Sequence, residues 1–311
     1  MAVPSDSMPR HRNRERKMAT ATGNFEIRAP RAWTSPAIFN SPHSGRAYTA
    51  EFLRQSRLSP RALRRSEDCY IDELFAGCLD HGAPLLLAHV PRSYIDLNRE
   101  PYELDPRMFA GELPGYVNSA SPRVAGGLGT IPRVVTEGED IYRTRLPAAE
   151  ALSRIDGIYR PYHRTLSALV AEVFAKNGSV LLVDCHSMPS SASSHISPAR
   201  VPPVDIVLGD RFGASCSEAV TGYLEELLRA RGLGVLRNKP YAGGFITHSH
   251  GAPRSGRHAL QIEINRALYI DETTLEKSQG FEPLRQALTA VTGDLLGALA
   301  SLIGPQQLAA E

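Results

Sequence analysis

The 311-residue sequence lacks the patterns that mark several large classes of protein. Its four cysteines, Cys69, Cys78, Cys185 and Cys216, are scattered and form no Cys-x-x-Cys pair. That pattern favours reduced thiols in a cytoplasmic protein over a disulfide framework. No apolar run approaches the roughly 20 residues that a membrane span needs. The net charge of +2 is too small to indicate a nucleic-acid or membrane partner.

The beginning of the chain also lacks the apolar core of a secretory signal. It is basic and polar instead, and we expect residues 1–23 to form a disordered extension. With 42% apolar and 22% charged residues, the whole chain has the composition of a soluble globular protein. No internal repeat or linker interrupts the remainder, so we expect one catalytic domain over residues 24–311.

Short apolar segments alternate with amphipathic ones along the chain. Strands are expected within residues 36–45, 83–91, 179–187, 204–210, 233–240 and 258–265. Helices are expected over residues 59–82, 148–177, 215–232 and 273–303, with a polar loop at 92–109 and an irregular Gly/Pro-rich insertion at 111–132. This alternation predicts an α/β fold with three layers, in which helices cover both faces of a mostly parallel, mixed sheet.

Polar side chains gather where the expected strands end, and ligands bind at that edge of an open α/β sheet. Two histidines and a carboxylate are a common zinc triad, and a further glutamate can move a proton for water activated by the metal. Arginines can hold a carboxylate and offset the charge of an oxyanion. The set therefore favours metal-assisted amide or ester hydrolysis, and it consists of His43, Arg92, Asn98, Arg99, His186 and Glu263.

Other interpretations of these residues stay open at this point. A histidine after a strand is more often an ordinary loop or core residue, and Glu263 could be the solvent-facing neighbour of Ile262. The histidines also lack a short fixed spacing such as HExxH. A non-catalytic binding protein and a cysteine hydrolase using Cys185 and His186 are the rival classes. The second is disfavoured because adjacent strand residues point to opposite faces.

Seven motifs occur in order between residues 40 and 271: NSPHSG, EDCYIDELF, VPRSYIDLNREP, LLVDCHSMP, DIVLGDRFG, GGFITHSHG and ALQIEINRALYID. Together they resemble the N-formylglutamate amidohydrolase family, whose fold is similar to that of zinc carboxypeptidases and aspartoacylases. The resemblance implies a zinc-dependent enzyme that removes formate from N-formyl-L-glutamate in histidine degradation. The alternative is a related zinc amidohydrolase acting on another N-acyl amino acid or a small peptide. The expected partner is thus a small molecule, and the oligomeric state is left open.

The resemblance also implies roles for individual residues. His43 and His186 look like metal ligands, and Glu263 sits where the family places its general base. Asn98 and Arg99 resemble the pair that grips a substrate carboxylate in carboxypeptidase-like enzymes. Four further residues complete the predicted site: Arg92 for oxyanion or carboxylate stabilisation, and Arg266, His248 and His250 for substrate binding.

The sequence departs from the carboxypeptidase pattern at one metal ligand. Zinc carboxypeptidases supply a histidine and a glutamate ligand from an HxxE element. The position of that glutamate after His43 is occupied here by Arg46, which cannot bind a cation. The resemblance therefore implies Asp68 as the carboxylate ligand, with Asp72, one helical turn later, as the fallback. Asp184 is expected to contact one of the metal-ligating side chains and fix its orientation without binding the ion itself. The implied ion is Zn²⁺, although other divalent ions accept similar sites.

Overall fold

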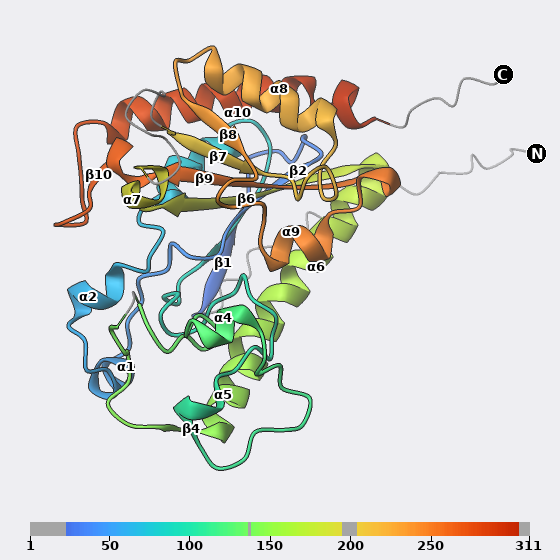
Figure 1. Ribbon diagram of the computed structural model, residues 1–311. Coiled ribbons are helices and arrows are strands. Elements are labelled where there is room, and N and C mark those ends of the chain that lie inside the picture. Colours follow the sequence, from blue (N-terminus) through green and yellow to red (C-terminus); the bar gives the residue numbers. More distant parts are fainter. Residues whose placement is uncertain (1–22, 136–137, 195–203, 305–311) are drawn as a thin grey trace, which may run out of the picture.

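The computed structural model describes residues 23–135, 138–194 and 204–304 (Figure 1). The predicted disordered extension therefore lies almost entirely outside the described residues. The central feature is a seven-stranded sheet with the strand order β1-β3-β2-β6-β9-β7-β8. Its strands are β1 (Phe25–Arg28), β2 (Ala37–Ser41), β3 (Leu85–Ala88), β6 (Val180–Met188), β7 (Ile206–Gly209), β8 (Val235–Arg237) and β9 (Arg257–Asn265).

The sheet is mixed, as the sequence predicts. The pairs β2–β3, β2–β6, β6–β9 and β7–β8 are parallel, whereas β1–β3 and β7–β9 are antiparallel. The strands β2, β6 and β9 are buried at nearly every position, as expected for strands with helices on both faces. Two small sheets lie outside it, β4 (Phe109–Ala110) with β5 (Leu146–Pro147), and β10 (Ile270–Asp271) with β11 (Glu276–Lys277).

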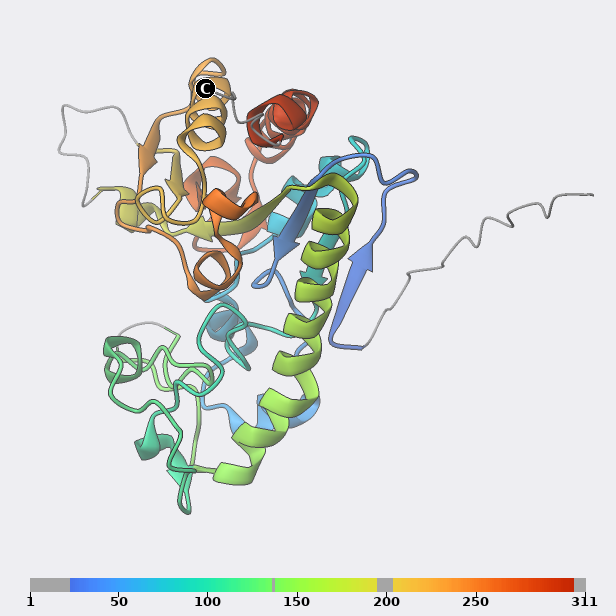
Figure 2. The same cartoon turned by 90° about the vertical axis from the view of Figure 1, so that its right-hand side faces the viewer.

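Helices cover both faces and complete the three layers (Figures 1 and 2). On one face lie α8 (Glu218–Arg229) and α10 (Phe281–Ile303), and on the other α6 (Arg160–Asn177) and α9 (Phe245–His250). The side chains of β6 alternate between two apolar cores. Leu181, Val183 and Cys185 belong to the core under α8 and α10, whereas Val180 and Leu182 belong to the core with α6.

The long helix expected over residues 148–177 is confirmed with one local change. It consists of α5 (Ala148–Arg154), a π-helical turn at Ile155–Tyr159 and α6. Pro161 in the first turn of α6 has no backbone N–H to donate, which fits the changed bonding there. Gly178 ends the helix with φ of +73°, a conformation that glycine adopts without strain.

The helix predicted over residues 59–82 is wrong as a single element. The structure has α2 (Pro60–Arg64), α3 (Ile71–Leu74) and a 3₁₀ turn at Ala76–Leu79. The interruption contains Asp68, whose backbone N–H donates to the carbonyl of His43 at 3.0 Å instead of to a helical partner. Tyr70 follows with φ of +60°, which ends any continuous helix. The contact with the His43 loop therefore overrides the local helical tendency.

The helices and strands differ from the expected ones elsewhere as well. The last helix begins at Phe281 rather than at Thr273. The sequence did not predict the edge strand β1 or the short helix α1 (Ala50–Gln55). The Gly/Pro-rich insertion contains α4 (Pro122–Ala125), and α7 (Ser190–Ser194) follows β6. These are short elements, whose existence depends on tertiary contacts more than on local propensity.

The helix α10 is also an exception to the expected lack of a membrane-length segment. Its 23 residues are long and apolar enough to cross a membrane by length and composition alone. Many of its apolar side chains, including Leu288, Leu295 and Leu299, are buried in the core that it forms with α8. A core helix passes the same test of length and composition, so α10 needs no membrane to explain it.

Replacement of Gly45 by alanine should destabilise the fold at the loop that carries His43. A Cβ atom at this position would lie 2.1 Å from the carbonyl oxygen of Val90, and a backbone atom cannot rotate away. We expect the free energy of unfolding to fall by about 1–3 kcal/mol, measured by urea denaturation. Gly115→Ala is the control, because nothing lies within 4 Å of its added Cβ. Equal stability of Gly45→Ala and the wild type would contradict this packing.

Candidate active site

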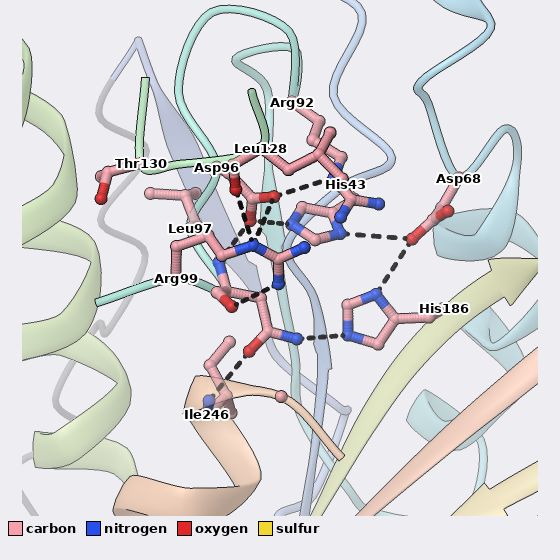
Figure 3. A network of polar contacts seen from close by, with 12 residues as sticks. His43, Asp68, Arg92, Asp96, Leu97, Arg99, Leu128, Thr130, His186 and Ile246 are labelled. Atoms are coloured by element: carbon pink, nitrogen blue, oxygen red, sulfur yellow. Dashed lines mark hydrogen bonds and ion pairs between the residues drawn. The ribbon is translucent and has the colours of Figure 1, made fainter. Parts of the chain in front are cut away.

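Two histidines and an aspartate meet at the edge of the sheet (Figure 3). His43 follows β2, His186 lies in β6, and Asp68 comes from the interruption between α2 and α3. Asp68 Oδ2 lies 3.4 Å from His43 Nδ1 and 2.9 Å from His186 Nδ1. All three residues are buried, and one potential ligand atom from each lies within 4.8 Å of the others. The three predicted metal ligands are therefore brought together.

Each histidine of this cluster contacts a second carboxylate on the side of its ring that faces away from Asp68. His43 Nε2 lies 2.7 Å from Asp96 Oδ1, and His186 Nε2 lies 3.0 Å from Asp184 Oδ2. Because each Nε2 faces an outer carboxylate, both Nδ1 atoms face inward toward Asp68. The predicted contact of Asp184 with one of the expected metal-binding side chains is therefore present, and that side chain is His186.

The second oxygen of Asp68 has its own partners. Ser187 Oγ donates to Asp68 Oδ1 at 2.9 Å, and a guanidinium nitrogen of Arg266 lies 3.2 Å from the same oxygen. These bonds leave Oδ2 as the oxygen that faces the two imidazoles. Arg266 thus contacts the aspartate of the cluster, and this contact differs from the substrate-binding role expected for it.

The cluster fits a divalent ion on two observations. Among the described residues, His43 Nδ1 is buried and makes no hydrogen bond, although it faces Asp68 and His186. Burial alone would lower the pKa of His186, but Asp184 and Asp68 raise that pKa well above its usual range. The negative field that favours a proton on this ring also favours a cation between the rings. Two imidazole nitrogens and a carboxylate oxygen are donors that suit zinc.

Glu263 lies next to the cluster because of strand register. It is the partner of His186 in the parallel pair β6–β9, so both side chains lie on the same face of the sheet. Gln261 Nε2 donates to Glu263 Oε1 at 2.8 Å. Burial and the neighbouring Asp68 raise the pKa of Glu263 to about 7, against the opposing effects of His186 and Arg92. A carboxyl group with this pKa can both accept and return a proton near neutral pH.

A cavity of about 770 Å³ opens onto these groups. Its wall includes His43, His186 and Glu263 together with the predicted arginines Arg92 and Arg99. Arg92 Nε donates to Asp96 Oδ2 at 3.0 Å, so this guanidinium is attached to the same carboxylate that holds His43. A concave site with a buried acid, two imidazoles and several cations suits a small anionic ligand.

Other residues expected in the site are placed differently. Asn98 lines the cavity, but its amide nitrogen lies 3.1 Å from His186 Nε2 and its oxygen accepts from the Ile246 N–H at 2.8 Å. Its amide is therefore engaged within the protein. His248 is an exposed residue of α9, and neither His248 nor His250 lines this cavity. Gly243 and Gly244, which precede α9, are the residues of the GGFITHSHG motif that line the wall.

Two further expectations have clear outcomes. Asp72 forms an ion pair with Arg46 at 3.2 Å and is absent from the cluster, so Asp68 and not the fallback joins the histidines. Cys185 is buried in the core on the opposite side of β6, as predicted, and burial raises the pKa of its thiol well above the usual range. A buried thiol of this kind does not suit a nucleophile.

Sequence reasoning missed several residues that shape the site. Asp96, which holds His43, stands two residues before Asn98 within the IDLNR motif, and that position was the available signal. Ser187 follows His186 directly and Gln261 precedes Glu263 by two positions, so strand alternation could have found Gln261. Arg123 also lines the cavity, from an insertion whose sequence has weak periodicity.

Comparisons with known proteins point in one direction. A family model described as N-formylglutamate amidohydrolase matches residues 35–270. The chain is 31% identical to an N-formylglutamate deformylase of Pseudomonas aeruginosa and 30% identical to one of Pseudomonas putida. Each match extends over 267 residues, which are 85% of this chain and 92% of the relative.

A solved structure gives the same result for the fold. The crystal structure of N-formylglutamate amidohydrolase from Ralstonia eutropha matches with a TM-score of 0.85 and 34% identity. The match covers 90% of this chain and 99% of that one. The layers and strand order described above therefore belong to a known architecture.

Replacement of His186 by alanine should abolish metal binding, because it removes one of three converging ligand atoms. We expect protein purified without chelator to carry a divalent ion, and His186→Ala to lose it, measured by plasma mass spectrometry. His258→Ala is the matched control: this buried histidine lies on β9 and accepts from the Ser217 N–H, outside the cluster. Wild-type metal content in His186→Ala would rule out the proposed ligand set.

Proposed function

Because the chain belongs to the N-formylglutamate amidohydrolase family, we propose that it hydrolyses the formamide bond of N-formyl-L-glutamate to formate and L-glutamate. The observation that carries this proposal is the buried cluster of His43, Asp68 and His186 beside Glu263. Zn²⁺ is the proposed ion, on the basis of the donor atoms. Histidine degradation in the cytoplasm is the proposed setting, because the relatives are deformylases of N-formylglutamate.

The ion would be held by Nδ1 of both histidines and by Oδ2 of Asp68. When bound, a divalent ion supplies Lewis-acid chemistry, which polarises a carbonyl oxygen and lowers the pKa of water. The outer partners fix the ligands for this role. Asp96 and Asp184 set the orientation of the two rings, and Ser187 and Arg266 hold the remaining oxygen of Asp68.

Glu263 is proposed to move the proton. Its carboxylate accepts a proton from water as the water oxygen forms a bond to the formyl carbon. The tetrahedral species then breaks its C–N bond, and Glu263 returns the proton to the departing nitrogen. Formic acid and the free amine of glutamate result, and the acid then ionises to formate as its proton, the second proton of the water, passes through solvent to the amine. The bond from Gln261 fixes one oxygen of Glu263 and leaves the other to act.

Arg92 is proposed to offset negative charge beside the reacting carbon. Its Nε donates to Asp96, its two terminal nitrogens make no hydrogen bond to a described residue, and the side chain lines the cavity. A positive group at this place stabilises an oxyanion or the α-carboxylate of the substrate. Arg99 lines the same wall and can bind a carboxylate further along.

A direct assay tests the proposal. We expect purified protein to release formate from N-formyl-L-glutamate, measured by coupling formate to a dehydrogenase. Chelation should abolish the activity, and added Zn²⁺ should restore it, because the ion supplies part of the chemistry. N-acetyl- and N-succinyl-L-glutamate in the same assay, followed by release of glutamate, test the acyl group. Faster turnover of either would identify a different acyl substrate.

Glu263→Gln should retain the metal and lose turnover. A glutamine keeps the size of the side chain but cannot accept the proton, so we expect kcat to fall by about 10²–10⁴-fold. Steady-state formate release and metal content measure the two effects. Glu272→Gln is the control, because Glu272 lines the same cavity but accepts a hydrogen bond from the Ser190 N–H. Wild-type turnover in Glu263→Gln would remove Glu263 from the mechanism.

A further inference from the structure

Three arginines form a row along the cavity wall, starting beside the cluster and leading away from it. Arg92, Arg99 and Arg123 all line the cavity. Arg92 Nε lies 3.0 Å and Arg99 Nε 3.7 Å from Oδ2 of Asp96, the carboxylate that faces His43, whereas Arg123 pairs with Glu103 at 3.9 Å. Arg92 and Arg123 are both among the charges that act on Arg99. Arg99 therefore lies between the other two guanidinium groups, and Arg123 is the member furthest from the histidines.

This row places like charges close together without enough acid to pair them. Burial lowers the pKa of Arg99, and the neighbouring Arg92 and Arg123 lower it further, although Asp96 opposes them. Asp96 is shared by His43, Arg92 and Arg99, so one carboxylate faces three positive or protonatable groups. Repulsion between neighbouring guanidinium groups is relieved when an anion binds between them, so the wall is suited to a carboxylate.

Arg123 lies on a segment that is fixed in place. The Ser121 hydroxyl accepts from the Val124 N–H at 3.1 Å and so caps α4, and Val124 is buried. Thr130, which follows α4, donates its N–H to the Glu103 carbonyl and accepts from the Asp96 N–H, both at 2.8 Å. These bonds attach the insertion to the loop that carries Arg99. The backbone that carries Arg123 is thus fixed by hydrogen bonds, whereas the Arg123 side chain is exposed at the cavity wall.

Arg99 and Arg123, the outer pair of the row, keep several N–H donors without a hydrogen-bond partner among the described residues. The guanidinium group of Arg123 makes no hydrogen bond to a described residue, and its one ion pair there, with Glu103, spans 3.9 Å. Arg99 uses Nε toward the Leu128 carbonyl and Nη1 toward the Asn98 carbonyl, which leaves Nη2 (Figure 3). Two guanidinium groups with donors to spare can bind one carboxylate through several hydrogen bonds.

We propose that Arg123, together with Arg99, binds the side-chain carboxylate of the substrate and makes the enzyme selective for acidic amino acids. This inference rests on the proposed function. N-Formyl-L-glutamate carries two carboxylates, and Arg92, which pairs with the Asp96 that faces His43, lies beside the cluster, where we place the α-carboxylate. The side-chain carboxylate lies beyond two methylene groups, and Arg99 and Arg123 offer it a second positive group in the same cavity wall. Arg123 is in this account a specificity residue and takes no part in bond breaking.

The alternative is that Arg123 only compensates the buried Glu103. The two accounts differ in what a neutral substitution does to substrates. A structural role affects all substrates alike through the shape of α4, whereas a specificity role affects only those with a charged side chain. N-Formyl-L-glutamine separates them, because it matches N-formyl-L-glutamate in size and lacks only the charge.

The test compares Arg123→Gln with the wild type on both substrates. For N-formyl-L-glutamate we expect kcat/KM to fall by about 10- to 150-fold, mostly through KM, as for a lost charge-assisted hydrogen bond. For N-formyl-L-glutamine we expect less than about a threefold change, because the charged partner is missing already. If its turnover is too slow to follow, its inhibition constant against N-formyl-L-glutamate serves instead. Arg123→Lys should show a smaller rise in KM than Arg123→Gln, since lysine keeps the positive charge but lacks the paired N–H donors of the guanidinium group.

The control is Arg107→Gln. Arg107 is an exposed arginine near the same insertion, it pairs with Asp105, and it does not line the cavity. It should leave both substrates unchanged. Equal losses on both substrates in Arg123→Gln, or no loss on either, would overturn the proposal. Failure of the proposed function has a different result, namely no metal-dependent formate release by the wild type. The two failures are therefore distinguishable in one set of assays.

Discussion

The carboxylate of Asp68, buried between the imidazoles of His43 and His186, is the contact on which the rest of the site depends. A carboxylate without water around it is stable only among donors and positive charge. Burial alone would raise the pKa of Asp68, but its hydrogen bond with His186 and the adjacent His43 ring hold that pKa well below the usual range. The same need explains why the chain leaves its helix at this residue and bonds to the His43 loop instead.

Two kinds of structure supply the groups around this contact. The strands β6 and β9 supply His186 and Glu263 at fixed register, in the most buried part of the sheet. The loops after β2 and β3, and the insertion with α4, supply His43 and the arginines. Groups that must keep a short fixed distance thus come from paired strands. The groups that line the rest of the cavity come from longer connections, which carry the ligand-binding residues in many α/β enzymes.

Much of this could be predicted from the sequence where the local pattern carried the information. Consecutive apolar residues at 180–183 predicted a strand buried on both faces, and alternation along it separated Cys185 from His186. The resemblance to the family supplied Asp68, which spacing alone could not. The interrupted helix and the edge strand β1 were missed because contacts distant in sequence decide them, such as the bond between Asp68 and His43. Asn98 and His248 were assigned by motif, and a motif does not say which way a side chain points.

The pairing of β6 with β9 has a consequence for how such an enzyme can change. Side chains on a strand alternate, so a slip of one residue would send His186 and Glu263 to opposite faces. The spacing between Glu263 and the cluster of His43, Asp68 and His186 can therefore be altered only in discrete steps, and a step of one residue destroys the arrangement. If the arginines select the substrate, as we propose, a new substrate preference has to arise in the connections that hold them. Laboratory libraries confined to residues 111–132 would explore that space while the reactive centre stays constant.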